Sequence, residues 1–381
     1  MKNSIYADHA ATTPLLPEAL EAMLPWLKEG FGNPSSLHSF GREARRAVEE
    51  ARLTIAECIG AKPDEIFFTS GGTEANNWVI KGTSGGLLVS AYEHHSVLNA
   101  AKAVSDLARD VGFIQPKSFG TVMTDDVRLN WPMKADWPDG VSIVSVMAVN
   151  NELGTINPIG ELSEAVHKRK AFFHTDAVQA VGKIDIDVRR WNVDFLSASA
   201  HKFGGPKGIG FLFAKDGRAP ERFVDGGSQE RGMRAGTENV AGVVGMAAAL
   251  RIACEWLEDD EADEQLDSLA DDLVAGIKRL FPDAVFHGRM IGPCLSGFVS
   301  VAIPGHPAEG MLHVFDLHGI AVSSGAACNS RETKLSHVLK AIGLSDELAS
   351  CTLRFSLGRK NSEQDVERIL DVFRLIKKTT S

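Results

Sequence analysis

Short apolar runs that stop at polar residues recur through the first 215 residues, and segments with helical periodicity lie between them. Short buried strands that alternate with helices pack into a parallel sheet covered on both faces, so we expect an α/β domain around a largely parallel sheet. The runs are EIFFTS (65–70), part of GGLLVSAYEHHS (85–96), VSIVSVMAVNN (141–151), KAFFHTDAVQAVG (170–182), VDFLSASAHK (193–202) and GIGFLFAK (208–215).

A second unit begins near residue 250. Its first segment, EWLEDDEADEQLDSLADDL (255–273), carries leucines at helical spacing and predicts one acidic, solvated amphipathic helix. Because 381 residues suit two domains, we expect a smaller α+β domain here. Further strands are expected at 297–303 and 351–358, and further helices at 16–30, 41–60, 331–344 and 362–378.

The composition excludes several function classes. A net charge of −10 gives no basic field for nucleic acid or an anionic membrane. The five cysteines form no CxxC pair and no dense framework, so neither a metal site nor secretion is expected. The N-terminus has no apolar signal region, and the apolar stretch 240–250 is too short to span a bilayer. These features predict a cytoplasmic protein.

Polar side chains stand at the ends of five expected strands. The carboxyl ends of parallel strands meet at one edge of the sheet, where ligands of such folds bind, so their convergence indicates a site. They are Ser70-Gly71-Gly72-Thr73, Glu93-His94-His95, Asn150-Asn151, Asp176 and Ser199-Ala200-His201-Lys202.

A buried acid and a lysine on this edge suit a pyridoxal cofactor. An apolar strand carries Asp176 inward, where a carboxylate can hold a pyridinium nitrogen protonated, and Lys202 can form the Schiff base. A structural cap or ion pair is the alternative for Asp176. Lys207 is the competing lysine, although a surface position would equally explain it.

The phosphate of such a cofactor has candidate ligands. Gly72 and Thr73 stand where a strand passes into a helix, and Ser199 and His201 flank the lysine. A tight turn explains the glycines equally well, and no Walker A pattern occurs in the chain. His94 can stack on the ring and pass protons, or be a satisfied polar residue.

Two residues of the second unit are candidates for chemistry with the substrate. Cys328 follows the small residues SSGAA, which predict an exposed loop where a thiolate reacts, although most free cysteines are buried and inert. Arg354 can clamp a substrate carboxylate bidentately, and a surface ion pair is an equal alternative.

Taken together, the motifs resemble those of cysteine desulfurases over nearly the whole chain, in the same order. SSGAAC resembles the loop of group I enzymes, and the group II pattern is absent. The motifs are YADHAATTP, FGNPSSLH, FTSGGTEANN, EHHSV, VNNELGTINPIG, HTDAVQAVGK, SAHKFGGPKGIG, GGSQERGMRAGTEN, SSGAAC and LRFSLGR.

This resemblance implies a pyridoxal 5′-phosphate enzyme with the class V aminotransferase fold, working as a homodimer. The fold implies a mostly parallel seven-stranded sheet in a large domain at 15–250. A small α+β domain is expected at 1–14 and 251–381. The short C-terminus after the last helix leads us not to assume the usual cluster-scaffold partner.

The resemblance also implies a role for each candidate residue. Lys202 bears the cofactor, Asp176 meets its ring nitrogen, Gln179 its ring oxygen, and His94 stacks on the ring. Gly72, Thr73, Ser199, His201 and the neighbouring subunit's equivalent of Thr237 hold the phosphate, with Asn151 beside the cofactor. Asn151 and Arg354 bind the substrate carboxylate, with Asn33 nearby.

The implied reaction takes sulfur from L-cysteine. Lys202 moves the Cα proton, and Cys328 receives the sulfur as a persulfide for an acceptor protein while L-alanine remains. Cluster assembly, tRNA thiolation and DNA phosphorothioation are open as pathways. Another class V enzyme, such as a selenocysteine lyase or an aminotransferase, and a catalytically idle scaffold are the alternatives.

Overall fold

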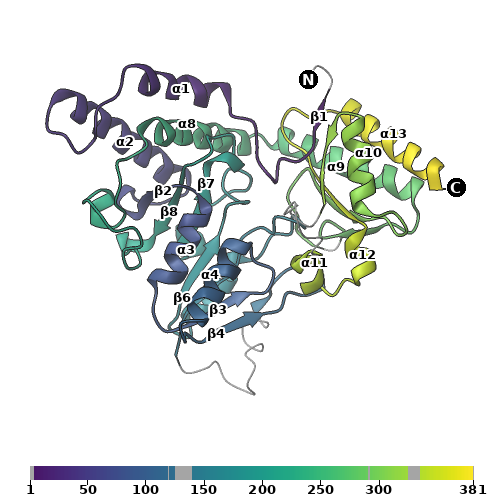
Figure 1. Ribbon diagram of the computed structural model, residues 1–381, viewed down its shortest axis with the longest axis horizontal. Coiled ribbons are helices and arrows are strands. Elements are labelled where there is room, and N and C mark those ends of the chain that lie inside the picture. The colour runs from purple at the N-terminus through teal and green to yellow at the C-terminus, as the bar shows by residue number, and fades with distance from the viewer. Residues whose placement is uncertain (1–3, 119, 125–139, 291, 325–334, 381) are drawn as a thin grey trace.

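The computed structural model describes residues 4–118, 120–124, 140–290, 292–324 and 335–380 (Figure 1). Seven strands form its main sheet in the order β2-β8-β7-β6-β5-β3-β4. β8 runs antiparallel to both of its neighbours, and the other pairs are parallel, so the expected mostly parallel sheet is confirmed. The strands are β2 (Ile66–Thr69), β3 (Gly86–Ser90), β4 (Val111–Ile114), β5 (Val141–Ser145), β6 (Phe172–Asp176), β7 (Phe195–Ser199) and β8 (Gly210–Ala214).

Helices cover both faces of this sheet. One face packs on α3 (Gly72–Gly82) and α4 (His95–Ser105), which meet Phe67, Val89 and Leu212. The opposite face belongs to a larger core that includes Phe68, Val144 and Phe211. Successive strand residues therefore enter different cores, which explains why the strands read as unbroken apolar runs. The helices in the larger core include α2 (Ser39–Cys58), α6 (Ile159–His167), α7 (Val188–Trp191) and α8 (Val240–Leu257), with α1 (Pro17–Lys28) packed against α8.

The second unit is built on a four-stranded antiparallel sheet in the order β12-β13-β10-β9. Ile5 and Ala7, from the start of the chain, lie in the same core as this sheet and its helices. The strands are β9 (Val285–His287), β10 (Phe298–Ala302), β12 (Ser323–Ser324) and β13 (Thr352–Ser356), while β1 (Ile5–Tyr6) pairs with β11 (Ile320–Ala321). The helices are α9 (Asp260–Leu280), α10 (Ala308–Leu317), α11 (His337–Ala341), α12 (Asp346–Ser350) and α13 (Glu363–Thr380).

The structure corrects two expected helices. The acidic segment 255–273 is not one helix, because α8 ends at Leu257 and α9 begins at Asp260. The carboxylate of Asp259 accepts from the Ala262 amide and caps α9, which favours a new helix start over continuation. Of the expected helix 331–344, the described part is helical only as α11, which Ser336 caps through the Leu339 amide.

The apolar stretch 240–250 proves to be part of a longer helix. α8 has 18 residues and is the single described helix with the length and apolarity of a membrane span. Its apolar residues, including Val243, Met246 and Leu250, lie in the large core. Packing inside the protein therefore accounts for its composition.

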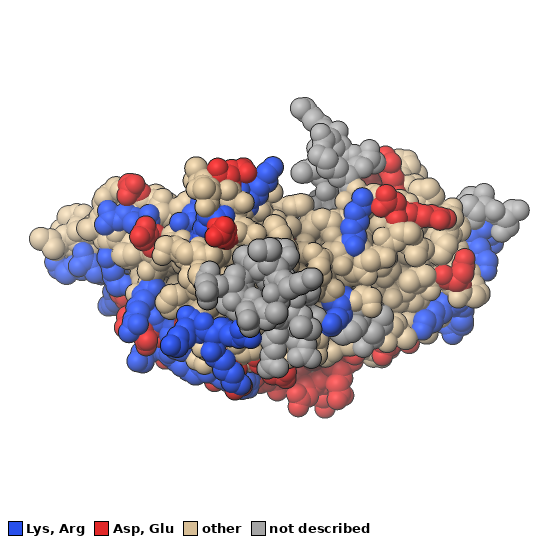
Figure 2. Space-filling model, turned by 90° about the horizontal axis from the view of Figure 1, so that it is seen from below, with Lys and Arg blue, Asp and Glu red and all other residues tan. Residues whose placement is uncertain are grey.

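Charges of both signs are distributed over the molecular surface. Figure 2 shows Lys and Arg side chains gathered toward the left of one face and Asp and Glu side chains at its lower edge. The net charge of −10 is thus not a single uniform field on that face.

Candidate active site

Adjacent strand ends bring the acid and the lysine to one edge of the sheet. Asp176 is the last residue of β6 and pairs in register with Ser197 of β7. β7 passes directly into a short 3-10 turn, η2 (Ala200–Lys202), which carries the lysine. The parallel pairing of β6 and β7 thus delivers both groups to the same end of the sheet.

The amine of Lys202 is held by the N-terminal segment. Its Nζ donates to the carbonyl oxygens of Ala10 at 2.7 Å and Ala11 at 2.8 Å. Burial, followed by the charge of Arg354, lowers the pKa of Lys202 to about 8, against the opposing effect of Asp176. A lysine with this pKa is neutral often enough at pH 7 to attack a carbonyl. Lys207 is exposed.

The carboxylate of Asp176 is buried and hydrogen-bonded on both oxygens. Oδ1 accepts from the Val178 amide at 3.0 Å, and Oδ2 accepts from Nδ2 of Asn76 at 2.6 Å. The same Nδ2 donates to the hydroxyl of Ser96 at 2.8 Å. Because an ionised carboxylate only accepts, the amide of Asn76 must present its nitrogen to Asp176.

This network continues to His94. The Ser96 hydroxyl lies 2.8 Å from Nδ1 of His94, and the Ser96 amide donates to the same nitrogen at 3.1 Å. Nδ1 is therefore an acceptor, and the ring proton belongs on Nε2. Desolvation lowers the pKa of His94, Asp176 opposes this, and the charge of Lys202 adds to the lowering. Asp176 and His94 are thus joined through two neutral side chains.

The first turn of α3 offers backbone donors for an anion. Gly71 has a φ of 150°, and the backbone of Gly210 passes so close to it that a side chain at 210 would collide. Thr73 is exposed in this turn, and buried Ser199 lies beside Gly71 and Gly72. A helix N-terminus with free amides and a neighbouring hydroxyl suits a phosphate.

His201 contacts the N-terminal segment. Its Nδ1 lies 3.1 Å from the hydroxyl of Thr12, and burial together with the charge of Lys202 lowers its pKa to about 4. The ring is therefore neutral near pH 7 and can donate one N–H to an anion.

Gln179 links the lysine to the N-terminal segment. Its Nε2 donates to the Ala10 carbonyl at 2.7 Å, the carbonyl that also accepts from Lys202. Its Oε1 accepts from Nζ of Lys183 at 2.6 Å. Because Lys183 can only donate, the end of the Gln179 amide that faces it is the oxygen, and the NH2 end faces Ala10.

The sequence allows a surface ion pair for Arg354, but the structure shows that its side chain is buried. Nη2 lies 2.6 Å from Oδ1 of Asp8, and Nη1 donates to the carbonyl of Asn151 at 2.7 Å. Two buried atoms here have no partner among the described residues, namely Nε of Arg354 and Oδ1 of Asn151. Buried polar groups normally have hydrogen-bond partners. The carboxylate of an amino acid could accept from Nε of Arg354, and its ammonium could donate to Oδ1 of Asn151.

Other polar residues of this edge serve the fold. Glu93 accepts from the Met147 amide at 2.6 Å and from the Ser90 hydroxyl, and burial raises its pKa. Oδ1 of Asn150 accepts from the amides of Glu152 and Leu153. No group of three potential metal ligands occurs in the described part of the chain.

Three candidates have no contact with these residues that the structure describes. Asn33 is exposed on the loop between α1 and α2, and its Oδ1 accepts from the Ser35 amide. Thr237 is exposed before α8. Cys328 lies outside the described residues; the strand before it, β12, pairs Ser323 with Arg354.

Asp8, Asn76, Ser96 and Lys183 are contacts of this site that the sequence did not single out. Asp8 and Arg354 are 346 positions apart, so no local pattern pairs them. Asn76 lies within the motif FTSGGTEANN, which is the one signal that pointed toward it.

Comparison with known proteins places this geometry in a family. The aminotransferase class-V family matches residues 5–369. The cysteine desulfurase IscS of Dictyoglomus turgidum is 44% identical over 386 residues, covering 99% of this chain and 96% of that protein. A solved NifS-like protein has a TM-score of 0.89 at 34% identity, with 99% and 100% of the two chains covered. A structure described as SspA in complex with cysteine has a TM-score of 0.79 at 32% identity, with 94% and 100% covered.

Proposed function

Because the chain belongs to the aminotransferase class-V family, within its cysteine desulfurases, we propose that it takes sulfur from L-cysteine through the residues below. It is a pyridoxal-phosphate-dependent enzyme that leaves L-alanine. The observation that carries the assignment is the buried carboxylate of Asp176 on one strand end and the amine of Lys202 beyond the next.

The residues at this edge fit pyridoxal phosphate. Asp176 is a buried acceptor, as a protonated pyridine nitrogen requires, and Lys202 has an amine with a pKa near 8. The first turn of α3 begins at Gly72 with the N-terminal backbone amides of a helix, which suit an anion. When bound, the cofactor supplies an electron sink for charge that develops on the substrate.

Each side chain has a proposed part in holding the cofactor. Lys202 holds its aldehyde carbon, Asp176 its ring nitrogen and Gln179 its ring oxygen. His94 stacks on the ring as a neutral imidazole whose orientation Ser96 fixes. Gly72, Thr73, Ser199 and His201 receive the phosphate, and Asn151 lies beside the cofactor.

The substrate is proposed to be bound by Arg354 and Asn151. Asp8 keeps the guanidinium in place, while Nε of Arg354 and Oδ1 of Asn151 still need partners. The amine of Lys202, freed as L-cysteine arrives, moves the Cα proton. Asn33 is retained as a further substrate contact, and its exposed position suits a residue offered to a second subunit.

Cys328 is the proposed acceptor of the sulfur. Its thiolate attacks the substrate sulfur, so that an S–S bond forms as the substrate C–S bond breaks. L-cysteine and the Cys328 thiol become L-alanine and the Cys328 persulfide, with no other oxidant or reductant. The persulfide then passes to an acceptor protein, for iron–sulfur cluster assembly or another thiolation.

A homodimer is proposed on a cluster of exposed apolar side chains. Phe31 and Leu37 are 80% and 82% exposed, and the Phe31 and Phe40 rings stack at 5.3 Å. Exposed aromatic side chains gathered in this way mark protein interfaces. Thr237, also exposed, is proposed to reach the phosphate in the neighbouring subunit. We place the enzyme in the cytoplasm.

Product analysis tests the function. Purified protein with pyridoxal phosphate and L-cysteine is expected to yield L-alanine and, with a reductant, an equal amount of sulfide. Formation of a keto acid would identify an aminotransferase instead. Turnover of selenocysteine without turnover of cysteine would identify a selenocysteine lyase, and failure to take up the cofactor would favour an idle scaffold.

A further inference from the structure

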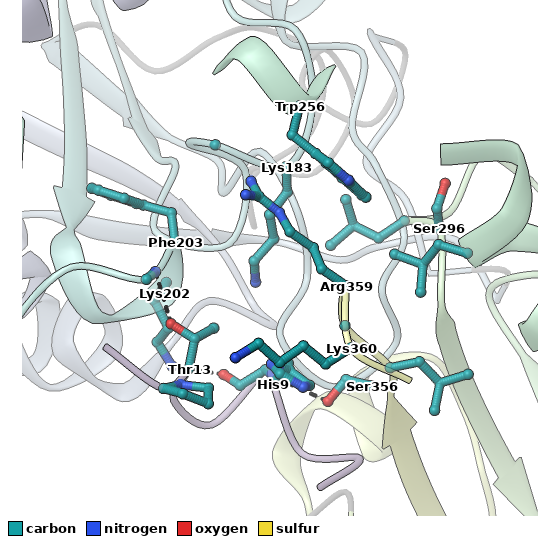
Figure 3. A pocket seen from close by; sticks show the side chains of 18 of the residues that line it. His9, Thr13, Lys183, Lys202, Phe203, Trp256, Ser296, Ser356, Arg359 and Lys360 are labelled. Carbon is teal, nitrogen blue, oxygen red and sulfur yellow. Dashed lines mark hydrogen bonds between the residues drawn. The ribbon is translucent and has the colours of Figure 1, made fainter. Parts of the chain in front are cut away.

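A cavity of about 170 Å³ lies against the N-terminal segment 9–16 (Figure 3). Its lining comes from this segment, from the turn at 182–183, from the junction of α8 and α9, and from the residues after β13. Among the side chains proposed to hold the cofactor or the substrate, only Lys202 reaches it. The cavity therefore borders the proposed cofactor site at Lys202, and neither Asp176 nor His94 lines it.

The walls of this cavity are largely apolar. They include Leu16, Phe203, Trp256, Leu266, Leu295 and Phe298. An apolar cavity of roughly 150 Å³ accommodates benzene, so this one has room for a single ring with a small substituent. Its size and lining do not suit a polar molecule such as L-cysteine.

Lys183 brings a positive charge into this apolar space. Figure 3 shows it among the lining side chains, with Trp256 to one side and His9 to the other. Its Nζ donates to Oε1 of Gln179 at 2.6 Å, and among the described residues no carboxylate pairs with it. An ammonium has three donors, so donors remain for a ligand. Desolvation, then the charges of Lys202 and Arg354, lowers the pKa of Lys183 to about 7, as expected for a half-buried cation that lacks an anion beside it.

The remaining charges of the lining favour an anion. Arg359 and Lys360 are exposed, and the Arg359 guanidinium lies 4.7 Å from the centre of the Trp256 ring. Asp263 is the one acid among the described lining residues, and its Oδ2 already accepts from Ser296 at 2.9 Å. Cations at the rim and in the interior attract negative charge.

We propose that this cavity binds a small monocarboxylate with one apolar ring. Its carboxylate pairs with the ammonium of Lys183, and its ring lies against Phe203, Trp256 and Leu295. The carboxylate supplies the anion that Lys183 lacks among the described residues, and the ring fills the remaining volume. This site is additional to the cofactor and cysteine sites.

A ligand bound at Lys183 would affect the cofactor site through hydrogen bonds that connect the two sites. Lys183 holds Gln179, and Gln179 and Lys202 both donate to the Ala10 carbonyl. Binding at Lys183 is thus expected to change the visible absorption of the bound cofactor. This consequence rests on the proposed function, whereas binding itself does not.

Calorimetric titration of the cofactor-loaded protein with phenylacetate tests the proposal, without L-cysteine present. We expect one site per chain. Lys183→Met should weaken binding roughly 10- to 100-fold, because a charge-assisted hydrogen bond is lost. Lys168→Met is the matched control, since Lys168 is an exposed lysine that pairs with Glu164 on α6, and it should bind as the wild type does.

Phenylacetamide provides a comparison that requires no variant. It has the same shape without the charge, so the wild type should bind it at least 10-fold more weakly, even if Lys183→Met proves unstable. Equal binding of both compounds, equal binding by Lys183→Met, or no binding of phenylacetate would overturn the proposal. Alanine formation, measured separately, reports on the proposed function alone.

Discussion

The amide of Asn76 donates a 2.6 Å hydrogen bond to Asp176 and a 2.8 Å bond to Ser96 from one nitrogen. The Ser96 hydroxyl in turn lies within hydrogen-bond distance of Nδ1 of His94. One side chain on α3 thereby orients both the acid and the imidazole proposed to hold the cofactor ring.

We expect Asn76→Ala to destabilise the protein by about 1–3 kcal/mol, because the buried carboxylate of Asp176 loses a donor. Cofactor affinity should fall with it, since His94 and Asp176 are no longer held together. Asn77→Ala is the neighbouring control; it removes hydrogen bonds to the backbone carbonyls of Thr73 and Ser96 and leaves Asp176 untouched. Thermal unfolding and cofactor titration measure both effects, and equal losses in the two variants would contradict the assignment.

Asp176→Asn is expected to reduce alanine formation by roughly 100- to 1000-fold, because the charge opposite the proposed ring nitrogen is removed. The cofactor band should still form, since Lys202 is unchanged. A variant that binds the cofactor and retains wild-type turnover would show that Asp176 has only a structural part.

Capture of the cofactor should depend on pH through Lys202. The pKa of Lys202 is lowered to about 8, so below pH 8 only a minor, neutral fraction of the amine can attack. The rate of capture by cofactor-free protein should therefore rise with pH and level off above about 8, whereas an ordinary lysine levels off near 10.4. Stopped-flow absorbance measures this rate.

Arg354→Gln should move this profile to higher pH, because the second cause of the lowered pKa is removed. Lys207→Ala should leave the profile unchanged. If the profile depends on Lys207 instead, then Lys207 rather than Lys202 binds the aldehyde of the cofactor.

The apolar cluster of Phe31, Leu37 and Phe40 leads to a prediction on assembly. Phe31→Asp combined with Phe40→Asp should convert a dimer into monomers in sedimentation velocity. Leu107→Asp is the control, since Leu107 is 83% exposed and lies beyond α4. Cofactor affinity should fall in the monomer if Thr237 of the second subunit contacts the phosphate.

The sequence was sufficient to predict the architecture and to place an acid and a lysine at the same edge of the sheet. Strands buried on both faces are long apolar runs, and polar residues must follow them, so Asp176 and Lys202 were visible as strand-end residues. The seven-stranded sheet was expected from the family resemblance.

Contacts between distant segments could not be predicted in the same way. For Arg354 the sequence allows both a surface ion pair and a substrate clamp, and its burial beside Asp8 depends on how β13 meets the start of the chain. The link from Lys183 to Gln179 is local, yet nothing in the pattern indicates that Lys183 is half-buried beside the site. The acidic segment read as one helix because its leucines keep helical spacing across the cap at Asp259.

The central claim is that sulfur from L-cysteine is transferred to Cys328. A single turnover with L-cysteine, without reductant, should give one alanine and one persulfide per site, with the persulfide on Cys328 by peptide mass spectrometry. Cys328→Ala should form neither, while Cys254→Ala, which changes a half-buried cysteine on α8, should form both. A persulfide on another cysteine, or undiminished alanine from Cys328→Ala, would contradict the account.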